Sequence, residues 1–209
     1  WAHENTRTAL FDAIERKETY ATTGPRMTVR FFGGWEFSDS DVHASDSVGI
    51  GYAKGVPMGG DLAKAKGNKA PNFMIQASKD PLSGNLDRVQ VIKGFLDDDG
   101  MPQEKVYAVA LSDNRKAGPD GKVPPVGNTV DVSTGNYINS IGDADLAVVW
   151  TDPDFDAGKR AFYYVRVLQI PTPRHTLFDA IALGIPAEET GQPATIQERA
   201  YSSPIWYTP

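Results

Sequence analysis

The amino-acid sequence predicts a mainly β protein: an antiparallel β-sandwich, immunoglobulin-like or similar, with one N-terminal α-helix and a short helical segment in a late loop. Three observations lead to this prediction. Several segments alternate apolar and polar residues with a period of two, as strands with one buried face do. Turn residues separate these segments. No helical pattern alternates with the strands, so a βαβ arrangement is excluded.

The strand predictions come from seven segments. Three of them alternate apolar with polar side chains, and four are rich in β-branched and aromatic residues, which favour strands. In chain order the segments are Met27–Phe31, Phe73–Gln76, Arg88–Val91, Val106–Leu111, Leu146–Trp150, Phe162–Leu168 and Ile205–Tyr207. Asp99-Gly100 lies between two of them and is a hairpin signal, because glycine accepts the positive φ of a tight turn.

A helix is predicted near the start, over Asn5–Lys17. Asn5 or Thr6 can cap it by accepting a hydrogen bond from a first-turn N–H group. Thr22–Pro25 breaks the pattern, since proline cannot continue a helix. The apolar stripe of this helix consists of Leu10, Phe11 and Ile14. A helix this short is marginal by itself, so the stripe needs a partner surface.

Two long connections interrupt the strand pattern. Ser38–Pro71 is polar and rich in glycine, and Pro171–Pro204 contains a short helical pattern at Thr176–Leu183. Connections of this length in a compact domain are usually functional or packed against something.

Composition limits the class of protein. The chain has 209 residues, of which 40% are hydrophobic, enough for one sizeable core. The net charge of −6 argues against a nucleic-acid partner, which would favour a basic excess. No apolar stretch approaches the length of a transmembrane segment, and the absence of cysteine excludes disulfides.

The chain opens on Trp1 rather than on methionine, shortly before the predicted helix. We therefore expect it to be the C-terminal piece of a larger protein. Residues 1–25 would be a remnant helix and connector from an upstream domain, and residues 26–209 would be the β-sandwich.

The sequence offers no specific catalytic or metal-binding pattern. His3, His43 and His175 are far apart and form no ligand motif. The spacing of Asp152, Asp154 and Asp156 matches the opening of a calcium loop, but Ala157 and Tyr163 stand where such a loop needs glycine and glutamate. A turn is the favoured interpretation, as it is for Asp97–Asp99. We therefore assign no catalytic, cofactor-binding or metal-binding residue.

The glycines of the segment from Gly49 to Gly55 have a spacing close to that of a dinucleotide loop. No predicted strand precedes them and no predicted helix follows, so we interpret the segment as a flexible loop. The neighbouring lysines are Lys54, Lys64, Lys66 and Lys69. They could contact a phosphate or an acidic partner, although such residues more often lie on a solvated loop.

Aromatic residues in the strand-like segments leave a second function open. The aromatic residues concerned are Trp35, Trp150, Tyr163, Tyr164, Tyr201, Trp206 and Tyr207. Rings at alternating strand positions usually pack in the core or along an edge. An exposed row of rings would instead indicate a carbohydrate- or ligand-binding module, and buried rings at Trp35, Trp150 and Trp206 would count against it.

Three runs resemble one protein family. They are Tyr20–Arg26 followed by Val29–Trp35, then Phe162–Leu168 with Ile170–Arg174 just after, and finally Gln197–Tyr207. Together they are similar to the domain-of-unknown-function 3604 family, over almost the whole chain. That family looks related to the PHP (polymerase and histidinol phosphatase) metal-dependent hydrolases. Its members are typically much longer, with a metal-binding barrel upstream of a β-rich C-terminal domain.

The resemblance implies a non-catalytic β-sandwich that packs on a missing barrel and shapes its active site. It implies no cofactor in this chain and a divalent metal in the upstream domain. The helix at Asn5–Lys17 resembles the last helix of such a barrel. Its stripe should therefore repack on the sandwich, self-associate with another chain, or fray. Location outside the bacterial cytoplasm, in the periplasm or cell envelope, is implied by the resemblance alone.

Overall fold

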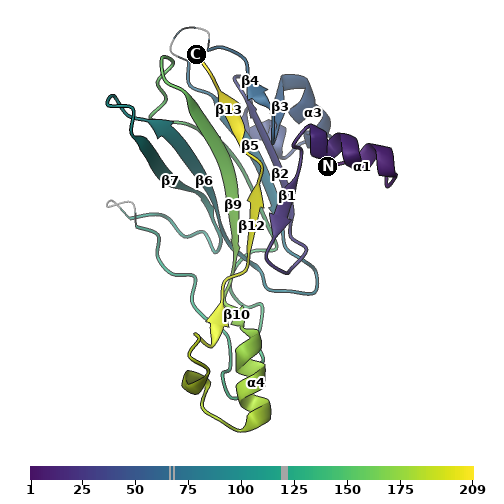
Figure 1. Ribbon diagram of the computed structural model, residues 1–209, viewed down its shortest axis with the longest axis vertical. Helices are drawn as coiled ribbons and strands as arrows, with labels where there is room; N and C mark the ends of the chain where they lie inside the picture. Colours follow the sequence, from purple (N-terminus) through teal and green to yellow (C-terminus); the bar gives the residue numbers. More distant parts are fainter. Residues whose placement is uncertain (66, 68, 119–121) are drawn as a thin grey trace.

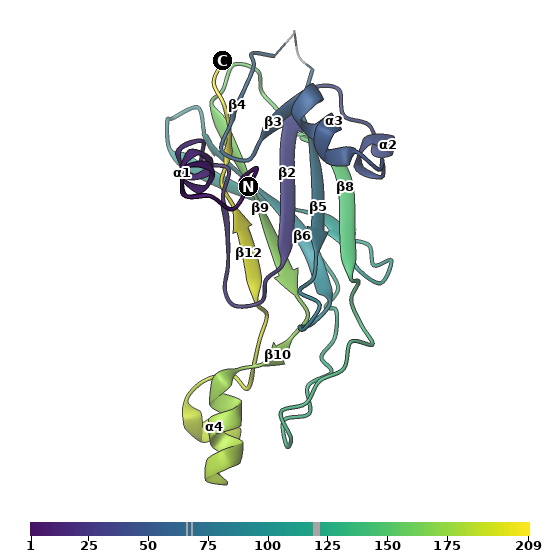
Figure 2. The ribbon, with the colours of Figure 1, turned by 90° about the vertical axis from the view of Figure 1, so that its right-hand side faces the viewer.

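The computed structural model describes residues 1–65, 67, 69–118 and 122–209. Two sheets packed face to face make up most of the molecule, with helices beside them and a helical arm below (Figures 1 and 2). The prediction of a mainly antiparallel β fold with an N-terminal helix is confirmed.

Within the described residues, four antiparallel strands form the smaller sheet, in the order β3–β2–β5–β8. Their bounds are β2 Thr28–Gly34, β3 Gly55–Pro57, β5 Asn72–Ser78 and β8 Asp145–Thr151. The two central strands pair over their full length, from Thr28 opposite Ser78 to Gly34 opposite Asn72.

Seven strands of the described residues form the larger sheet. Their bounds are β1 Tyr20–Thr22, β4 Asp61–Leu62, β6 Leu86–Leu96, β7 Pro102–Leu111, β9 Ala161–Gln169, β12 Arg199–Ser202 and β13 Ile205–Tyr207. Strand β9 is central, with β6 and then β7 on one side and β12 and β13 on the other. Strand β1 pairs with β12, and β4 pairs with β13 in the only parallel contact among these strands.

All seven predicted strand segments are strands in the structure. The Asp99-Gly100 signal is also confirmed, because β6 and β7 form an antiparallel hairpin around it and Gly100 has a φ of +75°. The additional strands β1, β3, β4 and β12 have two to four residues each, too few to show a periodic pattern.

The hydrophobic core lies between the two sheets. Phe31 and Phe73 from the smaller sheet stack with ring centroids 5.6 Å apart, and Tyr163 from β9 meets Phe73 at 4.5 Å. All three side chains are at most 1% exposed. Burying a large side chain of this kind contributes about 1.5–3 kcal/mol, so this contact between the sheets is a major part of the stability.

Helix α1 covers Arg7–Glu15, and Thr6 caps it by accepting a hydrogen bond from the Ala9 N–H at 3.3 Å. It ends where Lys17 adopts a left-handed conformation with a φ of +59°. Glycine usually occupies that position because it has no Cβ. Ala13, at 4% exposed, is the one residue of α1 buried in the described structure.

The apolar stripe of α1 remains in solvent. Leu10 is 47% exposed, and Phe11 and Ile14 are each 64% exposed. Of the three outcomes expected for this stripe, repacking on the sandwich is therefore not the one that the structure shows. The helix lies beside the sheets and is held by its C-terminal end (Figures 1 and 2). Its contact with the rest of the chain is made through the Ala13 side, so the bulky residues point away.

The interpretation of the segment from Gly49 to Gly55 as a flexible loop is also wrong. Helix α2 covers Asp39–Val42, and helix α3 covers Ser47–Lys54 and includes Gly49 and Gly51, while Gly55 begins β3. Gly51 is required by packing, since a Cβ there would lie 2.7 Å from the ring of Phe32. Both helices pack against the smaller sheet, as Figure 2 shows.

The late connection forms an arm that projects from one end of the sandwich (Figure 1). Its elements are β10 Thr172–Pro173, helix α4 His175–Leu183, the short 3-10 helix η1 Ala187–Thr190 and β11 Thr195–Ile196. Strands β10 and β11 pair at the base of the arm. The predicted helical segment at Thr176–Leu183 is thus confirmed. Among the described residues, no helix is long and apolar enough for a membrane span.

Candidate functional site

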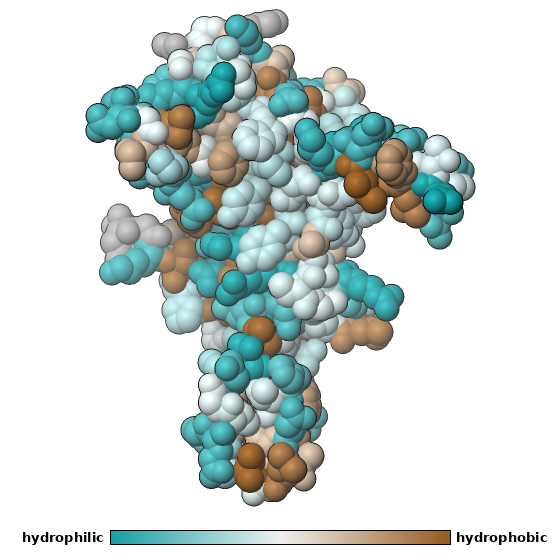
Figure 3. All heavy atoms as spheres, in the orientation of Figure 1, coloured by the Kyte–Doolittle hydropathy of each residue, from teal (hydrophilic) through white to brown (hydrophobic). Residues whose placement is uncertain are grey.

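The outer face of the larger sheet carries an aromatic patch. Along β9, Tyr163, Val165 and Val167 are fully buried in the core, whereas the alternate side chains are only half-buried. The patch consists of Phe162 and Tyr164 on β9, Tyr201 on β12 and Trp206 on β13. Figure 3 shows this face as pale over its middle, where side chains of weak polarity gather.

Trp206 and Phe162 form the centre of the patch. They are directly opposite each other in the sheet register, and their ring centroids are 5.1 Å apart at an interplanar angle of 45°. Trp206 is 42% exposed, although its neighbours Ile205 and Tyr207 are buried. The two rings therefore form a tilted platform that is accessible from solvent.

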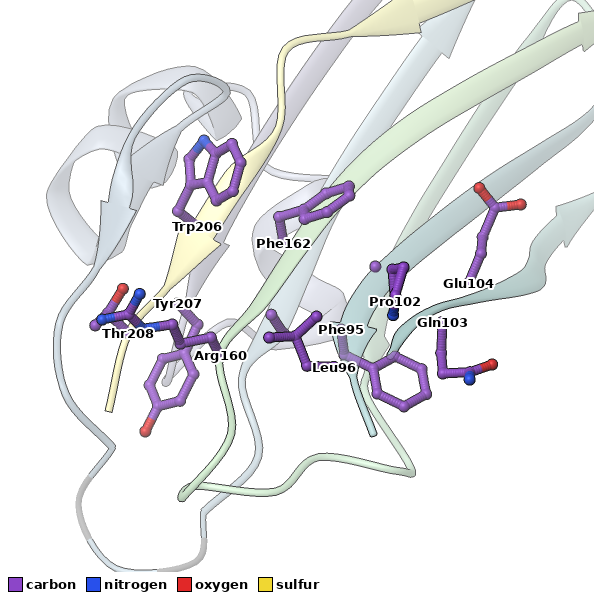
Figure 4. A pocket seen from close by; sticks show the side chains of 12 residues that line it. Phe95, Leu96, Pro102, Gln103, Glu104, Arg160, Phe162, Trp206, Tyr207 and Thr208 are labelled. Carbon is purple, nitrogen blue, oxygen red and sulfur yellow. The ribbon is translucent and has the colours of Figure 1, made fainter. Parts of the chain in front are cut away.

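A groove of about 530 Å³ runs along this platform. Figure 4 shows Phe162 between Trp206 on one side and Pro102 on the other, with Leu96 below it in this view. Its polar rim consists of Gln103, Glu104, Arg160 and Thr208. A mostly apolar cavity with a few polar groups at its edge is the usual form of a ligand site.

Gly94 on β6 makes room for the floor of the groove. It lies opposite Phe162 in the register, and a Cβ at position 94 would come within 2.2 Å of the Phe162 ring. The ring thus covers the backbone of β6 where a side chain would otherwise stand. On the next strand, Glu104 lies opposite Gly94.

Polar groups flank the aromatic platform on both sides. The register places Glu104 at one end of a row across the sheet and Asp61 at the other, next to Trp206. The side chain of Arg160 is exposed and makes no hydrogen bond or ion pair to the described residues. The indole N–H of Trp206 likewise donates no hydrogen bond to the described residues. These donors and acceptors are available to a ligand.

The three aspartates with calcium-loop spacing do not converge. The Asp152 carboxylate is buried and binds the Lys93 ammonium at 2.6 Å, with the Tyr163 hydroxyl donating to it at 2.7 Å. The Asp154 carboxylate accepts from Lys105 and Tyr107, and that of Asp156 accepts from a turn N–H. Each carboxylate has its own partner, which fits the turn interpretation.

The pKa of Asp154 lies below its usual value, first because of the hydrogen bond from Lys105 and then because of that from Tyr107. The pKa of the Tyr163 hydroxyl is raised, first by burial and then by the negative charge of Asp152. This tyrosine therefore stays protonated and donates. The cluster has the character of a structural ion-pair network.

The histidines remain dispersed. His3 precedes α1, His43 is the C-cap of α2, and His175 begins α4. Within the described part of the chain, no group of three or more histidine, aspartate or glutamate side chains could hold a metal ion.

The lysines of the 54–69 segment are engaged by carboxylates or lie apart. Lys54 binds Asp41 at 2.8 Å, and Lys69 binds Glu36. Lys64 is exposed, and Lys66 lies outside the described residues. The alternative that these lysines contact a phosphate or an acidic partner therefore finds no cluster of free cations among the described residues.

Two further apolar surfaces are exposed, and both appear brown in Figure 3. One is the stripe of α1 described above. The other lies on the arm, where Phe178 is 51% and Leu183 is 72% exposed. Part of the second surface is covered, because a Cβ on Gly135 would lie 2.7 Å from the Phe178 ring. The stripe of α1 is therefore the less covered of these two apolar surfaces.

The fold and these surfaces define a β-sandwich domain that has an exposed aromatic groove and an unpartnered helix. Comparison with protein families matches residues 1–209 to the family described as "Protein of unknown function (DUF3604)". The chain belongs to this family. Searches of curated proteins and of solved structures gave no match.

Proposed function

We propose that this chain is the C-terminal, non-catalytic β-sandwich of a larger, PHP-like, metal-dependent ester hydrolase. It packs on the catalytic barrel of that protein and shapes the mouth of its active site. The resemblance to bacterial PHP-like proteins motivates the hydrolase assignment and also an exported location. The upstream barrel supplies the divalent metal ions that activate water and stabilise developing charge.

The observation that carries this proposal is the exposed stripe of α1. An ordered helix with Phe11 and Ile14 each 64% exposed presents apolar area that a partner surface can bury. Covering such side chains is worth about 1.5–3 kcal/mol each when burial is complete. Since the helix resembles the last helix of a barrel, the proposed occupant is the barrel of the same protein.

A catalytic assay tests whether the barrel, and not this chain, catalyses ester hydrolysis. The 209-residue chain is incubated with manganese, zinc or magnesium ions and a set of phosphate and sulfate esters. We expect no metal-dependent turnover from this chain and measurable turnover from the separately produced barrel domain. Turnover by the 209-residue chain would show that it is catalytic and would overturn the proposal.

The same assay tests the contact through α1. Adding the wild-type chain to the barrel domain should change kcat/KM for the esters, because the sandwich helps to form the active-site mouth. The double substitution F11S/I14S should remove this change, and the arm substitution F178S should preserve it. An effect that F178S removes and F11S/I14S preserves would assign the contact to the arm.

A further inference from the structure

We propose that the groove on the outer face of the larger sheet binds a neutral oligosaccharide, with a pyranose ring seated on Trp206 and Phe162. This function is separate from the proposed contact with a barrel. The groove and the stripe of α1 lie on different elements and share no residue.

The aromatic platform suits the flat face of a sugar ring. The face of an aromatic ring carries negative charge density, which attracts the weakly positive C–H bonds on one side of a pyranose. Trp206 and Phe162 offer two such faces, tilted by 45° and with centroids 5.1 Å apart. A platform of this kind selects for ring-shaped ligands with an apolar side.

The rim supplies partners for hydroxyl groups. A sugar hydroxyl can both donate and accept a hydrogen bond. Glu104 and Asp61 are acceptors at the two ends of the row, while the Arg160 guanidinium and the Trp206 indole N–H are donors. The two donors make no hydrogen bond to the described residues. A polyhydroxylated ligand could therefore accept hydrogen bonds from them and donate to the two carboxylates.

Charge at the rim gives no preference for a charged ligand. Arg160 is the cation that lines the groove, and Glu104 is a carboxylate on the same rim. With charges of both signs at the rim, the groove as a whole favours neither an anion nor a cation. A neutral polar ligand is compatible with such a rim, and an apolar ligand would leave the rim groups without new partners.

The patch continues beyond the groove along β9. Tyr164 follows Phe162 on the same face, at a distance along the strand of roughly 6.6 Å. Tyr201 on β12 lies opposite Arg166, two residues beyond Tyr164 on the same face of β9. The row of rings therefore extends from Trp206 towards Tyr201, which is the arrangement expected for a chain of sugar units rather than for a monosaccharide.

Titration calorimetry with the 209-residue chain tests this proposal. The probes are cellohexaose, xylohexaose, mannohexaose and chitohexaose, with hexagalacturonate, decanoate and choline as charged or apolar alternatives. We expect saturable binding of at least one neutral hexasaccharide. The substitution Trp206→Ala should weaken it at least about tenfold, as the loss of a central aromatic anchor does.

Two further variants make the result decisive. Arg160→Ala removes an exposed side chain, so the fold is retained, and it should weaken binding at least about threefold. Phe11→Ala removes a similarly exposed ring on α1 and should leave the affinity unchanged. Near-ultraviolet circular dichroism of each variant checks the fold.

Three results would overturn the proposal: no neutral hexasaccharide binds, binding is the same in the W206A and R160A variants as in the wild type, or only a charged or apolar probe binds. The outcome is independent of the barrel contact, because neither F11A nor the absence of a barrel affects the groove.

Discussion

At the scale of single residues, charged side chains in the interior are paired. Lys93 is 4% exposed and Asp152 is 1% exposed, and they bind each other at 2.6 Å. The Asp152 carboxylate also accepts hydrogen bonds from the Tyr163 hydroxyl and from the Asp154 N–H. An interior charge is tolerated only when such partners replace water.

Removing one partner of this pair should be costly. The substitution Lys93→Met leaves the Asp152 carboxylate buried without its cation, which should lower the free energy of unfolding by about 3–5 kcal/mol. The double variant K93M/D152N removes both charges and should recover part of the loss. Urea denaturation of the three proteins measures this, and a K93M protein as stable as the wild type would show that the pair is dispensable.

Stability should fall in acid. The pKa values of Asp154 and Asp41 are both lowered, chiefly by hydrogen bonds from Lys105 and Lys54 respectively. A folded-state pKa below the unfolded value of about 3.9 means that the stabilisation is complete above that pH. It is lost as the pH falls through the lowered folded-state pKa.

Urea denaturation over a series of pH values measures this effect. The D41N/D154N double variant should show a shallower loss of stability below about pH 4 than the wild type does. Other aspartates with lowered pKa values, such as Asp80 and Asp97, should still make the double variant lose some stability as the pH falls. Equal slopes in the two proteins would mean that these two ion pairs do not contribute.

At the scale of elements, strands were predictable where their alternation was long enough to read. Strand β13 matches its predicted range of Ile205–Tyr207, and β6 and β7 meet at the predicted hairpin. Helices α2 and α3 were not predicted, because they are short and their sequences contain glycine and serine that favour loops. Contacts with the smaller sheet stabilise them, and such contacts are not visible in local sequence.

The orientation of α1 could also not be predicted from the sequence. The stripe of Leu10, Phe11 and Ile14 predicts an amphipathic helix but not which face the chain can reach. The left-handed turn at Lys17 and the contact of Gly59 with that turn fix the direction of the helix. These long-range contacts decide that Ala13 faces inward.

The substitution Gly59→Ala tests this anchor. Gly59 has a φ of +89°, and a Cβ there would lie 2.4 Å from the Lys17 carbonyl oxygen. The matched control is Gly100→Ala in the β6–β7 turn, where φ is +75° and nothing lies within 4 Å. G100A should cost about 1–2 kcal/mol from backbone strain, and G59A at least about 1 kcal/mol more from the clash.

Thermal and urea unfolding compare the two glycine variants, and hydrogen exchange of the α1 amides adds a local measurement. Exchange in α1 should speed up in G59A and remain unchanged in G100A. Equal stability of the two variants would show that the contact between Gly59 and Lys17 does not anchor the helix.

At the scale of the whole molecule, the aromatic groove was only partly predictable. In the run Phe162–Leu168, the period of two places Tyr163 in phase with Val165 and Val167, and so puts Phe162 and Tyr164 on the opposite face. That signal could have separated core rings from surface rings. The approach of Trp206 to Phe162 depends on the pairing of β13 with β9, more than forty positions away in the chain, which no local pattern gives.

The three tryptophans at positions 35, 150 and 206 do not share one environment, which the sequence pattern could not show. Trp35 and Trp150 are partly buried against the core, whereas Trp206 is exposed at the groove. The division of the chain at residue 25 stays a prediction. Strand β1, at residues 20–22, already pairs with β12 of the larger sheet.

The central claim is that α1 is the surface through which this domain meets a catalytic barrel. The most direct measurement is titration calorimetry between the 209-residue chain and the separately produced barrel domain, at concentrations up to about 1 mM, the effective concentration of a linked domain. The account predicts saturable 1:1 binding that F11S/I14S weakens at least about tenfold and F178S leaves unchanged. No binding, or equal binding by the F11S/I14S variant, would contradict it.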